Sequence, residues 1–347
     1  MPTPDEDDPR RDADARPPDS VRTAIEAGDW DAVASLIDGP DAEPLETRRE
    51  RVRALKPVVE GRSDLHEHLA PLLRPLLDDE DRSIRLTATK HLVDVAAATP
   101  RAVAPVAPAL TERLRDDFYF VRARSAEALG LLARRRPDAI DSTTVLARLV
   151  VGLSFDEPEV ERKMAKALAD VAIGEPRALR YLVSDLVDHL DAEDDLVRYH
   201  LVTALAAVAT AHPGDVRAAT AALTARLDDE VPFVRGRAAE ALGLIAGPRP
   251  DSIAPAADRL AARSDDEDAF VAERARFARN RVEDDPDANG DRGGIGTLRG
   301  IADGTESIAE EIANPSPDDG RACPRCGEGV DARPPFCPAC GVPFPPG

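Results

Sequence analysis

The sequence predicts an all-α protein: a right-handed α-solenoid of about six to seven helical hairpins, followed by a small module with four cysteines. Two patterns indicate the repeats. An apolar residue, here called the anchor, recurs at intervals of 37, 39, 37, 37 and 37 residues, and proline recurs with the same spacing. A fixed period shared by two residue types is typical of stacked repeats. The anchors are Ile84, Val121, Val160, Val197, Val234 and Val271, and the prolines are Pro100, Pro137, Pro176, Pro213 and Pro250.

Each anchor starts a pattern typical of an amphipathic helix. In one repeat Val234, Ala238, Leu242 and Ile245 occupy positions 0, +4, +8 and +11, which form a single stripe on a helix. Acidic residues precede most anchors, where the N-terminus of a helix favours them. A second helix is expected after each proline, because its missing N–H costs nothing in a first turn. Each repeat is therefore a hairpin that buries its apolar face only by stacking on its neighbours.

The period also sets the expected boundaries. Residues 1–19 are expected to be a disordered acidic segment, and 20–44 a helical cap in which Trp30 covers the open end of the stack. The repeats are expected over 45–283, where the last, partial repeat is charged enough to act as a polar terminal cap. The expected repeats span about 45–77, 78–114, 115–153, 154–190, 191–227, 228–264 and 265–283.

One run of residues carries a family resemblance. Phe-Val-Arg-x-Arg-x-Ala-Glu-Ala-Leu-Gly-Leu occurs within 116–132 and again within 228–244, each time after paired aspartates. It resembles the HEAT-like repeats first associated with phycobilisome lyases. The resemblance implies that the acidic turn residues and the arginine after each anchor form a structural ladder between repeats. The arginines in question are Arg85, Arg122, Arg198 and Arg235, whereas Glu161 and Ala272 interrupt the series.

The only four cysteines form two C-x-x-C pairs in residues 321–347, and they resemble the knuckles of a zinc ribbon. Four thiolates complete a closed tetrahedral shell, so we expect one structural Zn²⁺. Two disulfides or a redox dithiol are the alternatives, and the lack of a secretory signal and of a thioredoxin-like domain disfavours them. The expected ligands are Cys323, Cys326, Cys337 and Cys340.

Residues 284–320 are rich in Asp, Gly and Pro and are expected to be a flexible linker. Within it, 295–313 carries apolar residues at helical spacing. That stretch is expected to form a short helix, which either docks on the last repeat or binds a partner.

Composition restricts the setting of the protein. The chain has 66 acidic and 45 basic residues, a net charge of −21, and only four lysines: Lys56, Lys90, Lys163 and Lys166. This excess of acid, with Arg in place of Lys, resembles the haloarchaeal type of composition found in extreme halophiles, although an ordinary acidic protein is the alternative. No apolar run is long enough to span a membrane, so a cytoplasmic location is expected.

The sequence identifies no catalytic or cofactor-binding residue. His66 and His68 form the one close histidine pair and are interpreted as surface polar residues. The leading hypothesis is a non-enzymatic scaffold whose solenoid surface binds a protein partner, with the tethered ribbon as a second contact. The alternative is a nucleic-acid-associated accessory protein in transcription, translation or DNA repair, which the net charge disfavours. A bilin-lyase-like enzyme is less favoured, because only the resemblance suggests it.

Overall fold

The computed structural model describes residues 17–39, 44–282 and 294–314. Within these ranges every regular element is a helix, so the prediction of an all-helical repeat fold is confirmed there. The helices form two compact units: unit 1 extends to Ala222, and unit 2 begins at Leu223. The division lies inside α15 (Thr220–Arg226), and the spacing of the anchors passes through it unchanged.

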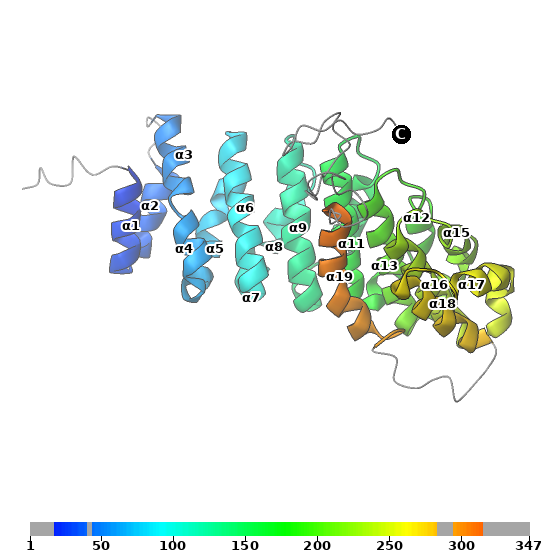
Figure 1. Cartoon of the computed structure of the whole chain (residues 1–347). Coiled ribbons are helices and arrows are strands. Elements are labelled where there is room, and N and C mark those ends of the chain that lie inside the picture. Colours follow the sequence, from blue (N-terminus) through cyan, green and yellow to red (C-terminus); the bar gives the residue numbers. More distant parts are fainter. Residues whose placement is uncertain (1–16, 40–43, 283–293, 315–347) are drawn as a thin grey trace, which may run out of the picture. The chain divides into compact units, whose positions relative to one another are not determined.

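Unit 1 is built on a row of helices, here called the anchor helices. Four of them contain an anchor, and the first, over 45–61, belongs to the expected repeat 45–77. Consecutive members pack side by side, α6 on α9, α9 on α11 and α11 on α13 (Figure 1). The four anchors of this row, from Ile84 to Val197, are at most 1% exposed. The anchor helices are α3 (Leu45–Arg53) with α4 (Lys56–Gly61), α6 (Arg82–Ala98), α9 (Tyr119–Arg135), α11 (Pro158–Gly174) and α13 (Asp195–Ala211).

Shorter helices, here called flanking helices, connect the anchor helices of unit 1. After α6, each connection begins at its periodic proline, as the first-turn preference of proline predicts. Leu110, Leu149 and Leu186 on these helices are buried, so the hairpins cover one another. The flanking segments are η1 (Ser63–Leu65), α5 (His66–Leu73), η2 (Pro75–Asp78), α7 (Pro100–Val103), η3 (Ala104–Val106), α8 (Ala107–Arg113), η4 (Pro137–Ala139), α10 (Ser142–Gly152), η5 (Pro176–Leu179), α12 (Val183–Val187), α14 (Pro213–Val216) and η6 (Arg217–Ala219).

Small residues let two anchor helices approach closely. At Gly130 on α9, an added Cβ would lie 2.9 Å from the Cα of Ala167 on α11. That distance is shorter than real Cβ contacts, so glycine is required there by packing rather than by backbone conformation. The sequence therefore fixes the spacing of α9 and α11 through residue size.

The N-terminal helices are α1 (Pro17–Ala27) and α2 (Trp30–Asp38), joined at Gly28, whose φ of 71° suits a residue without a Cβ. Helix α1 starts before the expected boundary at residue 19. Trp30 stacks on His68 of α5, with ring centroids 4.8 Å apart. The expected disordered segment lies outside the described residues, except for 17–19.

Unit 2 pairs α16 (Pro232–Ala246) with α18 (Ala269–Val282), connected by η7 (Pro250–Ala256) and α17 (Ala257–Arg263). The turn at 294–296 docks on this pair: the Gly296 N–H donates to Glu240 Oε1 at 2.7 Å, and a Cβ on Gly296 would lie 2.4 Å from the ring of Phe277. Helix α19 (Leu298–Ala313) follows, three residues later than expected, because Thr297 caps it by accepting from the Gly300 N–H. Ile301, Thr305 and Ile308 form its buried stripe.

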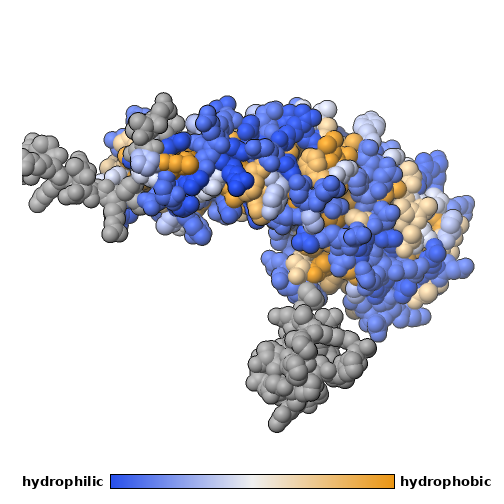
Figure 2. All heavy atoms as spheres, turned by 90° about the horizontal axis from the view of Figure 1, so that it is seen from above, coloured by the Kyte–Doolittle hydropathy of each residue, from blue (hydrophilic) through white to orange (hydrophobic). Residues whose placement is uncertain are grey.

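Hydrophilic side chains cover most of the face seen in Figure 2, with apolar side chains gathered in small areas between them. Large apolar side chains that are exposed in the described part of the chain are few: Leu45, Val151 and Tyr181. Among the described helices, none has the length and apolar character needed to cross a membrane.

Candidate functional site

The four predicted zinc ligands lie outside the described residues, as does all of 321–347. Within the ranges that the structure describes, no group of histidine, cysteine and acidic residues is arranged to hold a metal ion. The arginines that follow the anchors are described, and each contacts its own repeat or the next.

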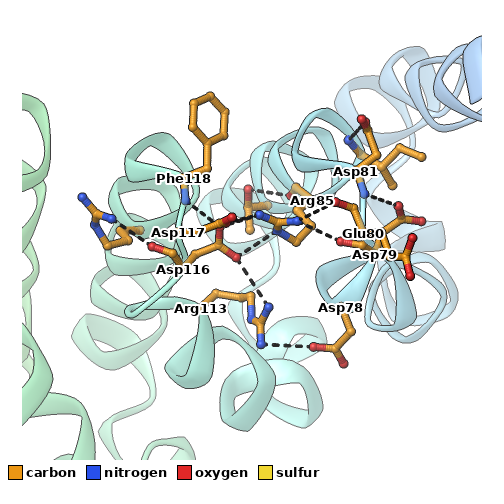
Figure 3. Close-up of polar contacts among 12 residues, drawn as sticks. Asp78, Asp79, Glu80, Asp81, Arg85, Arg113, Asp116, Asp117 and Phe118 are labelled. Carbon is orange, nitrogen blue, oxygen red and sulfur yellow. Dashed lines mark hydrogen bonds and ion pairs between the residues drawn. The ribbon is translucent and has the colours of Figure 1, made fainter.

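Arg85 shows the contacts of the predicted ladder most fully (Figure 3). Its Nε and Nη2 donate to the two carboxylate oxygens of Asp116 in the next repeat, both at 2.9 Å. Its Nη1 donates to the carbonyl oxygens of Asp79 and Glu80 in its own loop. The side chains of Arg85 and Asp116 are 8% and 1% exposed. One guanidinium therefore closes its own turn and joins it to the following one.

Asp116 is itself held by several donors. The Phe118 N–H donates to its Oδ1 at 2.9 Å, and Arg113 lies 3.4 Å from its Oδ2. Burial opposes ionisation of this carboxyl, but the hydrogen bonds from Arg85 and Phe118 outweigh burial and lower its pKa. The carboxylate is therefore charged at neutral pH and fully paired.

Arg235 and Arg48 follow the same rule, because in each case the next repeat offers an aspartate five residues before its anchor. Arg235 Nη1 donates to the carbonyls of Asp229 and Glu230, and its Nη2 lies 3.2 Å from Asp266. Arg48, which the sequence analysis did not include, pairs with Asp79 in the same way. Its position after Thr47, 37 residues before Ile84, was the available signal.

The middle of unit 1 departs from this rule. Phe155 stands where the aspartate is expected, so Arg122 lies over its ring, 4.9 Å from the centroid, and pairs with Glu157 at 2.8 Å. Glu161 replaces the next arginine, and the following repeat carries Ala192 at the aspartate position. The arginine and the aspartate that would form this contact of the ladder are therefore both absent. Arg162 instead pairs with Asp194.

Arg198 donates to the carbonyls of Ala192 and Glu193 and pairs with Asp195 at 2.8 Å. The guanidinium therefore holds its own turn, as Arg85 does. Ala272 follows the last anchor. Because alanine has no guanidinium, no ladder contact can start at this position.

A cleft of about 450 Å³ opens on the anchor helices of unit 1, and the sequence analysis did not predict it. Its floor is α6, which contributes Lys90 and Asp94, and its walls are the broken helix α3–α4 on one side and α9 on the other. The residues that line it are Arg53, Lys56, Glu60, Thr87, Lys90, His91, Val93, Asp94 and Arg124. This cleft is the candidate functional site.

Pro57 accounts for the broken wall. A proline inside a helix has no N–H to donate and clashes with the carbonyl four residues earlier, here that of Arg53. The helix stops at Arg53 and resumes at Lys56. The break exposes the Val52 carbonyl, to which the Nε2–H of His91 on α6 donates at 3.0 Å. Burial lowers the pKa of His91, so the ring is neutral at neutral pH, and its Nε2–H is hydrogen-bonded to the backbone.

The cations of the cleft are weakly engaged. Lys90 is exposed and forms no ion pair with any described residue. Lys56 lies 3.4 Å from Glu60, and Arg53 lies 3.0 Å from Glu46, in pairs that are more than half exposed. Exposed pairs of this kind contribute little stability and rearrange readily. Arg124 is the exception, since it pairs with Glu127 at 2.6 Å.

The two carboxyl groups of the lining differ in setting. Glu60 is exposed beside Lys56, whereas burial, together with the charges of Glu60 and Glu127, raises the pKa of Asp94. The lining therefore offers four cationic groups and two acceptors.

The same face continues along α9 and α11 as an ion-pair network. Glu127 accepts from Lys163 at 2.7 Å as well as from Arg124. Burial opposes ionisation of Glu127, but Lys163 and Arg124 outweigh it and lower its pKa. Asp170 likewise pairs with Arg134 and Lys166. These carboxylates neutralise the cations of α11, which leaves those of the cleft as the accessible positive charge.

Two histidines elsewhere in unit 1, His66 and His200, are buried. The interpretation of His66 as a surface residue is wrong: it is 0% exposed, and its ring bridges the carbonyl of Val59 and the hydroxyl of Thr99. His200 on α13 is buried, and burial, with smaller effects from Lys166 and Lys163, lowers its pKa to about 3. Sequence position could not separate these histidines from exposed ones, because burial depends on packing between helices.

Comparison with known proteins identifies the repeats. Residues 107–186 and 183–278 match the family model of HEAT repeats. A crystal structure of an engineered protein, a structural genomics target, is similar with a TM-score of 0.64 and 22% identity, over 77% of this chain and 71% of that one. A designed armadillo repeat protein, solved in complex with the peptide (KR)4, is similar with a TM-score of 0.55 and 20% identity. The match covers 67% of this chain and 100% of that one.

Computationally designed armadillo repeat proteins for modular peptide recognition give a TM-score of 0.54 at 21% identity, over 61% of this chain and 99% of theirs. No curated protein matches the chain. At these identities the solved structures show the fold alone.

Proposed function

We propose that the chain, a HEAT-like repeat protein, is a non-enzymatic scaffold that binds a protein partner on the anchor-helix face of unit 1. The observation that carries this proposal is the cleft: three successive anchor helices present exposed polar side chains around one opening. Repeat proteins of this architecture offer extended surfaces for binding. The structurally similar armadillo repeat proteins, one of which was solved with a peptide, support the proposal that this chain binds a protein partner.

The lining favours binding over catalysis. Its one histidine has its Nε2 proton engaged by the Val52 carbonyl, and its remaining polar groups are charged ends of long side chains and one threonine hydroxyl. Such groups can position a ligand through ion pairs. Covalent catalysis requires a nucleophile next to a general base, whereas the Thr87 hydroxyl of the lining donates to the Ser83 carbonyl.

The ladder arginines are proposed to be structural, in a role that supports binding. Arg85 and Arg235 each fix the distance between consecutive repeats through buried pairs. A cleft formed by several repeats keeps its shape only if their spacing is fixed, so the ladder makes the binding surface rigid in advance.

A structural zinc ribbon at 321–347 is proposed as a second, tethered contact. The donor set supports this, because two C-x-x-C pairs supply the four thiolates of a closed zinc shell. Two contacts on one chain raise the overall affinity through effective concentration.

Affinity capture tests the proposed function. The tagged full chain is used in its own cell extract at native salt, with and without nuclease, next to a chain truncated after Asp319. We expect one protein to be recovered whether or not nuclease is added, and to be recovered less with the truncated chain. Recovery that disappears with nuclease would assign the protein to nucleic acid instead, and no specific recovery would contradict a scaffold.

A further inference from the structure

The lysines of this chain mark one surface. Against 66 acidic residues the chain has only four lysines. They lie on α4, α6 and α11, all of them anchor helices of unit 1. Lys56 and Lys90 line the cleft, and Lys163 connects to it through Glu127 and Arg124. Lysine, in contrast to arginine, is thus confined to these anchor helices of unit 1.

Within the cleft this charge is available to a ligand. Lys90 has no ion-pair partner among the described residues, and Lys56 and Arg53 pair only in exposed, weak contacts. An incoming anion that binds these three cations therefore does not have to break a buried pair. Hydrogen bonds between charged groups of this kind are stronger than those between neutral groups.

The acceptors in the lining indicate what kind of anion fits. Glu60 and Asp94 belong to the same lining as the cations, and they can accept from amide N–H groups. A peptide supplies both carboxylates and N–H donors, whereas a nucleic acid strand supplies a continuous row of negative charge. The net charge of −21 also repels a long polyanion more strongly than a short peptide.

From this juxtaposition we infer that the cleft between α3–α4, α6 and α9 binds an acidic peptide segment of the partner, with Lys56, Lys90 and Arg53 receiving its carboxylates. The inference rests on the proposed scaffold function and names the chemistry of its partner.

Fluorescence anisotropy with the full-length protein tests it. The probes are a labelled decapeptide of alternating Glu and Gly, its Gln counterpart, its Lys counterpart and a single-stranded oligonucleotide, each at several salt concentrations. Lys56→Glu combined with Lys90→Glu reverses two charges at exposed positions of the cleft. Arg135→Glu combined with Arg101→Glu reverses two charges at exposed positions outside the lining and serves as the matched control.

We expect the Glu peptide alone to bind, more weakly as salt rises, and the cleft variant to lose at least about tenfold in affinity while the control variant changes less than about twofold. Circular dichroism melts show whether both variants are folded. Equal binding of the Gln peptide, equal binding by the cleft variant, or tighter binding of the oligonucleotide would each overturn the inference.

Repeating the capture from extract with the cleft variant separates the two proposals. If the natural partner is recovered equally by the variant and the original chain, the scaffold function stands and the acidic-peptide cleft is wrong. Loss of the partner with the cleft variant alone supports both.

Discussion

Arg85 illustrates how one side chain can fix the distance between two repeats. A guanidinium is planar and donates in several directions at once, so it can bond to two carbonyls of its own loop and to a carboxylate of the next. Lysine has a single charged nitrogen and cannot copy this geometry. The preference for arginine at the ladder positions is therefore structural.

Replacing Arg85 should show how much the ladder contributes. Arg85→Ala leaves Asp116 buried without its main partner, so we expect the free energy of unfolding to fall by about 3 kcal/mol. The free energy of unfolding of Arg85→Lys should lie between those of the original chain and Arg85→Ala, because lysine keeps the charge but loses the two-point contact with Asp116. Urea titration at fixed salt measures the change. Arg62→Ala, which breaks an exposed pair with Asp64, is the control and should cost at most about 1 kcal/mol.

Buried histidines should make stability depend on pH. Burial lowers the pKa of His91 in the folded protein below its ordinary value of 6.5. The unfolded chain therefore binds a proton that the folded chain does not, and the free energy of unfolding should fall as pH drops below about 6.5. His200 adds to this in the window between 6.5 and about 3.

The His91 contribution can be isolated by substitution. His91→Gln keeps a donor toward the Val52 carbonyl but does not titrate, so its stability should fall less steeply below pH 6.5 than that of the original chain. Parallel slopes in urea titrations across this range would contradict a neutral, buried His91.

At the scale of the element, the anchor helices and their period could be read from the sequence, since both follow from local patterning. The periodic prolines likewise predicted where the flanking helices begin. The cleft could not be predicted from the sequence, because it arises from the break at Pro57 together with side chains from three helices that are distant in sequence. The four lysines were visible in the sequence, but only the fold places two of them around one opening.

The missing rung between α11 and α13 offers a test of the ladder as a pairing rule. Glu161 stands at the arginine position and Ala192 at the aspartate position of the next repeat. Glu161→Arg with Ala192→Asp should therefore restore a rung. We expect the double variant to be more stable than the sum of the single variants by about 1 kcal/mol.

A double-mutant cycle from urea titrations measures this coupling. The pair Glu175→Arg with Ser184→Asp, which lies outside the ladder positions and changes the net charge by the same amount, controls for the change in net charge. Additive effects at 161 and 192 would mean that the arginine and aspartate positions do not act as a pair.

At the scale of the whole molecule, the proposed zinc ribbon should be energetically separate from the repeats. A segment as small as 321–347 has little core of its own, so zinc should supply its folding free energy, on the order of 10 kcal/mol. The repeats bury their own apolar stripes. We expect one zinc per chain by elemental analysis, and chelation should leave the helical melt unchanged.

Cys323→Ser should lose the zinc without affecting the helices. Mass spectrometry that found no zinc and two intact disulfides in the chain as isolated would contradict the proposed metal site.

Site-specific photo-crosslinking determines whether a protein partner contacts the cleft of unit 1. A benzophenone amino acid is placed at Thr87, inside the cleft, or at Tyr181, which is 80% exposed on the segment between η5 and α12. Each full-length protein is irradiated in its own cell extract after nuclease treatment. We expect one discrete protein adduct from position 87 and none of that size from position 181. An adduct from position 181 alone, or none from position 87, would contradict this expectation.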